Sequence, residues 1–174
     1  MKIFKLNLLL ILINISLTAN CQNLIVDSAV VKKQAEQMMI SFIAKDYDSF
    51  IEFNSPKIIE LMGGKENLKE ILINSLKEME NEGFTIDSVS IGSIEKIVQA
   101  GDEIHVLLPQ KLIIKTQKGK LISNSYLIAI STSGTKWYFV DAGKLTAKNR
   151  NLIFPNYNEE LVIPAKQPPI LVEQ

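Results

Sequence analysis

The spacing of hydrophobic residues changes once along the chain, near Gly83, from a helical period to the alternation typical of strands. Before Gly83, apolar residues recur at helical spacing over residues 27–45, 50–62 and 66–82. Polar capping residues, a first-turn proline at Pro56 and glycines at 63, 64 and 83 mark where these segments begin and end. The pattern predicts three N-terminal helices.

After Gly83, four apolar stretches alternate with polar residues in the manner of strands, over residues 84–98, 103–116, 121–132 and 136–142. The links between them are short and contain glycine, which predicts an antiparallel meander of hairpins. Gly92 falls opposite Pro109 in this arrangement, close to a slip in the apolar phase. These features predict β-bulges in a strongly curved sheet.

The chain beyond Gly143 carries four of the six prolines. This composition predicts a largely extended C-terminal tail over residues 144–174, packed on or trailing from a domain of residues 22–143. Two apolar groups, at 152–154 and 161–163, can press onto that domain. The last few residues are expected to be loose.

The N-terminus has the layout of a signal peptide over residues 1–21: Lys2 and Lys5, an apolar run, then small and polar residues. The run is shorter than the about 20 residues that a membrane-spanning helix needs. Signal peptidase I cleavage after Cys21 is one outcome. A lipobox, in which Cys21 is lipidated and retained, is the other, although Thr18 and Asn20 fit it poorly. The sequence leaves both open and predicts an exported protein: periplasmic, secreted or lipid-anchored to the cell envelope.

Composition narrows the chemistry of the folded domain. Cys21 is the only cysteine, so the domain after it has no disulfide, thiolate nucleophile or cysteine metal site. The 19 basic residues match the 19 acidic ones, and loss of Lys2 and Lys5 leaves a slight acidic excess, which disfavours nucleic-acid binding. His105 is the only histidine and is expected on the strand face opposite the apolar core. No metal and no cofactor is predicted.

The order of these elements resembles a known superfold. Three helices followed by a curved four-stranded antiparallel sheet is similar to the nuclear transport factor 2-like fold, a cystatin-like α+β cone. Within it, the run from Asp46-Tyr47 through Ser55-Pro56 to Gly63-Gly64, and the later Lys136–Asp141, resemble a group of uncharacterised exported Bacteroidetes proteins. The superfamily holds isomerases, dehydratases and cyclases as well as binding modules without chemistry, so the resemblance implies a fold and leaves the function open.

The resemblance also implies where a ligand pocket would lie. Isomerase members of the superfamily place carboxylates and a tyrosine at the mouth of the cone, where they move a proton and stabilise an oxyanion. No residue aligns with such a motif, and no catalytic residue is assigned. Five residues are pocket candidates because of their polarity within apolar strands or their position at an element end: Tyr47, Gln110, Asn124, Tyr126 and Asp141.

Two functions follow as hypotheses. The first is an exported, non-catalytic binding or accessory module for an unknown protein or small-molecule ligand, with a membrane contact only through a lipid anchor. The alternative is an isomerase- or dehydratase-like enzyme that uses a pocket carboxylate. Trp137, Tyr138 and Phe139 must divide between the two sheet faces, so the outer face is partly apolar. A homodimer or the C-terminal tail would cover it, and the sequence leaves both open.

Overall fold

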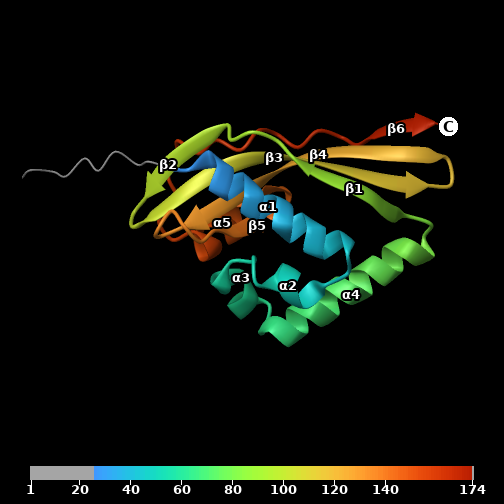
Figure 1. The fold of residues 1–174 in the computed structure, drawn as a ribbon, viewed down its shortest axis with the longest axis horizontal. Coiled ribbons are helices and arrows are strands. Elements are labelled where there is room, and N and C mark those ends of the chain that lie inside the picture. The colour runs from blue at the N-terminus through green and yellow to red at the C-terminus, as the bar shows by residue number, and fades with distance from the viewer. Residues whose placement is uncertain (1–25, 174) are drawn as a thin grey trace, which may run out of the picture.

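Helices precede strands along the chain, as the change in hydrophobic period predicts. The computed structural model describes residues 26–173, and Figure 1 shows an α+β domain in which a curled antiparallel sheet carries helices beneath it. Cys21 and the signal-peptide prediction lie outside the described residues. Over the described range, no helix is long and apolar enough to cross a membrane.

Within residues 26–173, four helices precede the sheet, where the sequence predicted three: α1 (Ser28–Ile43), α2 (Tyr47–Ile51), α3 (Pro56–Leu61) and α4 (Lys65–Asn81). The predicted second helix is two helices. Pro56 has no N–H and disfavours helical backbone at the residue before it, so Ser55 is extended at ψ 132° and α3 begins afresh at Pro56.

The described strands form one six-stranded sheet: β1 (Thr85–Ile91), β2 (Lys96–Ala100), β3 (Glu103–Thr116), β4 (Gly119–Ser131), β5 (Tyr138–Asp141) and β6 (Ile170–Glu173). The order is β1-β3-β4-β5, with β2 also on β3 and β6 also on β4, and all pairs are antiparallel. The predicted antiparallel meander is confirmed, and β6, which pairs with β4, is a strand that was not predicted.

The prediction of a single strand over residues 84–98 is wrong. The segment breaks at Gly92 into β1 and β2, and a register shift between Ile86 and Ser88 adds a bulge. The Gly92 N–H still donates to the Pro109 carbonyl at 2.8 Å, and a Cβ on Gly92 would lie 2.8 Å from Pro109 Cγ. Gly92 therefore lets the Pro109 ring approach the backbone, and the expected irregularity of the sheet at this point is confirmed.

The sheet is buried on both faces around the hairpin of β3 and β4. Val106 and Leu108 point inward to α1, while Leu107 and Ile128 point outward, and none of the four is more than 2 % exposed. This follows from strand alternation when both sets of positions are apolar. The hairpin therefore needs a cover on each side.

The C-terminal segment provides the outer cover and is not the largely extended tail that its prolines suggested. It contains a 3-10 turn (Ala142–Lys144), helix α5 (Ala147–Ile153) and β6. Thr146 and Asn149 form a capping box that begins α5. Phe154 and Leu161 are 1 % and 0 % exposed against the outer face. The last residues pair with β4 rather than hanging loose.

His105 lies on the outer face, as alternation predicts, but the C-terminal segment buries it completely. Its Nε2 lies 3.0 Å from Glu103 Oε2, and its ring meets the Phe154 ring edge-on at 5.1 Å. This environment fits a packed side chain and not an accessible acid–base group.

Gly92→Ala is expected to destabilise the domain. The new methyl group would overlap the Pro109 ring, and overpacking of this kind costs about 1–3 kcal/mol. Ser93→Ala, at the exposed next position, is the matched control and should leave the free energy of unfolding nearly unchanged. Urea unfolding of the two variants tests this, and equal midpoints would show that Gly92 and the Pro109 ring do not approach closely.

Phe154→Ala is expected to lower the free energy of unfolding by about 3–5 kcal/mol, because it removes a buried ring from the outer core. Leu152→Ala, two residues earlier and 57 % exposed, is the control with a small expected effect. Thermal unfolding monitored by circular dichroism compares them. A C-terminal segment that is detached in solution would make both substitutions silent.

Candidate functional site

A partly open cavity of about 360 Å³ lies between α1, α4 and the inner face of the sheet. Most of its lining is apolar. Helices contribute Met38, Met39, Phe42, Leu72, Leu76 and Met79. The sheet contributes Val89, Leu112 and Leu127, among others. The volume and lining are those of a small-molecule pocket.

The cavity exists because α4 does not pack fully onto the sheet. The helix is amphipathic, yet none of its residues is buried, and Leu72, Leu76 and Met79 on its apolar face are only half-buried. By contrast, α1 lies directly on the sheet, where Val31, Ala35 and Met38 are at most 3 % exposed. The apolar face of α4 therefore borders a space.

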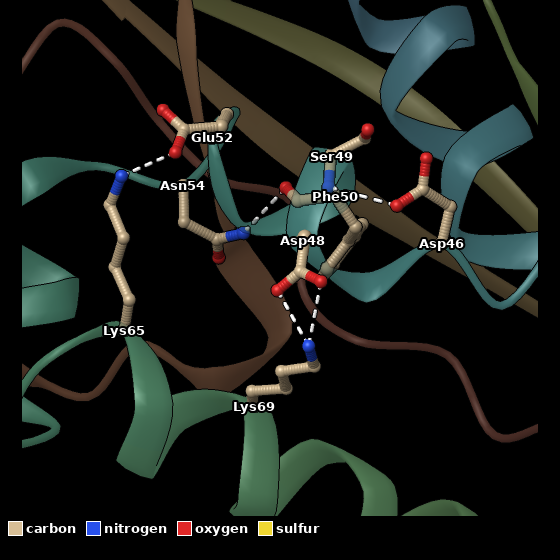
Figure 2. Close-up of polar contacts among 8 residues, drawn as sticks. All are labelled: Asp46, Asp48, Ser49, Phe50, Glu52, Asn54, Lys65 and Lys69. Atoms are coloured by element: carbon tan, nitrogen blue, oxygen red, sulfur yellow. Dashed lines mark hydrogen bonds and ion pairs between the residues drawn. The ribbon is translucent and has the colours of Figure 1, made fainter.

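Exposed ion pairs hold α4 at this distance. Figure 2 shows Lys69 of α4 bonded to both carboxylate oxygens of Asp48, at 2.7 Å each, and Lys65 bonded to Glu52. Near the other end of the helix, Lys45 Nζ lies 2.9 Å from Glu80 Oε1. These contacts link α4 to α2 and to the end of α1 at both ends of the helix.

The partner helix α2 is itself fixed to the sheet. Asp46 caps it by accepting a bond from the Ser49 N–H at 3.2 Å, and the Asn54 amide donates to the Phe50 carbonyl at 3.1 Å (Figure 2). The Phe139 N–H of β5 donates to the Phe53 carbonyl at 2.7 Å. Asp48 and Glu52, the carboxylates that bond to α4, therefore belong to a segment that is itself hydrogen-bonded to β5.

Within these ion pairs, the charge of one partner shifts the pKa of the other so that the charged form is favoured. The ammonium of Lys65 holds the pKa of Glu52 below its usual range, and Asp48 raises the pKa of Lys69. A lowered carboxyl pKa gives stabilisation that is lost as pH falls through it, whereas a raised lysine pKa gives stabilisation lost as pH rises through it. The ion pairs therefore stabilise the position of α4 most at pH values above the pKa of Glu52 and below the pKa of Lys69.

Few polar groups face the cavity: Asn54, Ser75, Gln110, Asp141 and Lys144. Asp141 and Lys144 are exposed, and Asp141 Oδ1 accepts the Gly143 N–H at 2.8 Å. Gln110 comes from the sheet, between the apolar positions 108 and 112 of the same face. Its Nε2 makes a long bond of 3.4 Å to Ser125 Oγ, and its buried Oε1 has no partner in the described part of the chain.

The five candidates from the sequence do not form one site. Gln110 and Asp141 both line the cavity. Asn124 and Tyr126 lie on the outer face, beside a separate pocket of about 390 Å³ that reaches residues 163–167. A more open pocket of about 490 Å³ beside Gly92 and Pro109 brings Gln110, Asn124 and Tyr126 together. Tyr47 borders a smaller pocket of about 120 Å³ next to Phe42 and Glu80.

The arrangement does not assemble acid–base chemistry of the isomerase type. Of the residues that the structure describes, no tyrosine lines the cavity and Asp141 is the only carboxylate that does; it is exposed and bonded to its own turn. Among residues 26–173, no three His, Cys, Asp or Glu side chains gather as a metal site. A mostly apolar space, in which the partly buried Gln110 presents an unpaired amide oxygen, is suited to holding a molecule.

The apolar lining was not recognised as a site from the sequence. The methionines at 38, 39 and 79 follow helical spacing, and this pattern is the same for a side chain that packs on a sheet and for one that faces a cavity. Met38 does both, since it is 3 % exposed in the core and borders the cavity. The methionines on the apolar helix faces were the available signal, because methionine suits adaptable apolar surfaces.

Lys69→Gln is expected to loosen α4. Amide hydrogen exchange over residues 65–81 should become severalfold faster, while exchange over β3 stays unchanged, because the lost ion pair holds only the helix. Lys77→Gln, on the same helix at a lysine that forms no ion pair with any described residue, is the control. In the parent protein, raised salt should have the same effect as Lys69→Gln, since the pairs are exposed. Equal exchange in both variants would contradict this role of the pair.

Comparison with models of known protein families gives no match, and comparison with curated proteins gives none either.

Proposed function

We propose that this protein is an exported, non-catalytic binding module that holds a small, largely apolar molecule in the cavity beneath α4. The observation that carries the proposal is the apolar cavity of about 360 Å³, which α4 borders with a half-buried apolar face. Burial of apolar ligand surface against this lining supplies the driving force for binding.

The domain is proposed to be a nuclear transport factor 2-like cone. The curled sheet and the helices beneath it support this, and the cavity lies where the cone would open. A protein exported by the proposed signal peptide would meet its ligand outside the cytoplasm. The protein is proposed to carry the ligand or to present it to a partner.

The isomerase- or dehydratase-like alternative has weaker support. It needs a carboxylate and an oxyanion donor that converge on one substrate position. Asp141 is the available carboxylate, and its exposure and its bond to Gly143 direct it toward its own turn. Binding without chemistry accounts for the cavity with fewer requirements.

Saturable binding of a neutral apolar fluorophore, N-phenyl-1-naphthylamine, tests the proposal. Ser75→Trp places a large ring into the cavity from an exposed helix position and should weaken binding by about tenfold or more, since about 1.4 kcal/mol of lost contact has this effect. Asn74→Trp, on the adjacent residue and outside the cavity lining, is the matched control.

Thermal unfolding of both tryptophan variants confirms that the fold is retained. Equal affinity of the fluorophore for both variants would place binding elsewhere. Absence of saturable binding to the unaltered protein would overturn the proposed function.

A further inference from the structure

Among the described residues, the sheet places two polar side chains in the cavity lining, Gln110 and Asp141, and of these Gln110 is the one that is partly buried. It sits on the inner face of β3, directly opposite Ser125 of β4 in the register. On the same strand and face, Leu108 and Leu112 flank it, and Leu108 is fully buried. Because side chains alternate between the two faces of a strand, the Gln110 amide lies on a face where the positions before and after it are apolar.

The amide is only partly satisfied. Its Nε2 donates to Ser125 Oγ across a long 3.4 Å, and its Oε1 is buried without a partner among the described residues. A buried acceptor that lacks a donor costs free energy, so it favours whatever brings one. A ligand that enters the cavity must either supply a donor to this oxygen or leave it unpaired.

The surroundings also restrict the charge of that ligand. The charged residues that line the cavity, Asp141 and Lys144, are both exposed, and the nearest positions on the same face of β3 as Gln110 are leucines, with Lys111 on the opposite face. An ionised group beside Gln110 would lose its hydration without gaining an opposite charge. A carboxylate would moreover present only acceptors to an acceptor.

We propose that the ligand of this cavity is a neutral, mostly apolar molecule that carries a hydroxyl or amide N–H, and that this donor bonds to Gln110 Oε1. The inference rests on the proposed function and adds the chemical class of the ligand. It makes Gln110 the residue that selects and orients the ligand, while the methionine and leucine side chains bind its apolar body.

A matched set of three compounds tests this: naphthalene, 2-naphthol and 2-methoxynaphthalene, each competing with N-phenyl-1-naphthylamine for the full-length protein. The naphthol has a donor, the methoxy compound has only an acceptor, and naphthalene has neither. The naphthol should bind about three- to tenfold more tightly than either of the others, which corresponds to one hydrogen bond.

Gln110→Met removes the amide at similar side-chain length, and Asn124→Met makes the corresponding change on the outer face, away from the cavity. The preference for the naphthol should vanish in Gln110→Met, with naphthalene bound as well or better, and persist in Asn124→Met. Urea unfolding verifies that both variants fold.

The outcomes separate the two proposals. If the fluorophore and all three compounds fail to bind the unaltered protein, the proposed function fails. If they bind without preference for the naphthol, or if the preference survives Gln110→Met, only the assignment to Gln110 Oε1 is overturned. Tighter binding of the methoxy compound would also overturn it, because the amide would then present its N–H₂ to the ligand.

Discussion

Burial of the β3–β4 hairpin on both faces is the constraint on which the rest of the structure depends. Val106 and Leu108 face one way and Leu107 and Ile128 the other, and all four are excluded from water. Such a hairpin needs a layer on each side. On the inner side the layer is α1. On the outer side it is the C-terminal segment, which explains why a proline-containing stretch folds back and pins Phe154 and Leu161 to the sheet.

The curl of the sheet then decides where the inner layer stays incomplete. Gly92 and Pro109 interrupt the regular ladder, and α1 covers the sheet around Val106 and Leu108. Farther along β3, near Gln110 and Leu112, the facing element is α4, which is tied to α2 by ion pairs and does not descend onto the strands. Helix α1 packs closely on one part of the sheet, whereas α4 is attached by ion pairs over the other part. The cavity lies between these two helices and the sheet.

The sequence was sufficient for some of these features and not for others. Hydrophobic period and glycine-containing links predict helices followed by an antiparallel sheet, and Gly92 opposite Pro109 predicts an irregularity. Separation of β1 from β2 was not predictable, because Ile94, Ile97 and Val98 continue a strand-like apolar composition beyond Gly92. Helix α5 was missed because it is only 7 residues long and prolines dominate the composition after it. The cavity was missed because helical periodicity shows which face of α4 is apolar, not how far that face lies from the sheet.

The distinction between binding and catalysis in such a cavity depends on which polar groups it encloses. A carboxylate becomes an acid or base near neutral pH when burial and neighbours shift its affinity for protons. Asp141 instead lies exposed and bonded to the Gly143 N–H, whereas the buried polar atom without a partner in the described lining is the amide oxygen of Gln110, which does not titrate. An amide fixed among apolar side chains can direct a hydrogen bond and thereby set the orientation of a ligand. The geometry therefore favours recognition of a bound molecule over its chemical conversion.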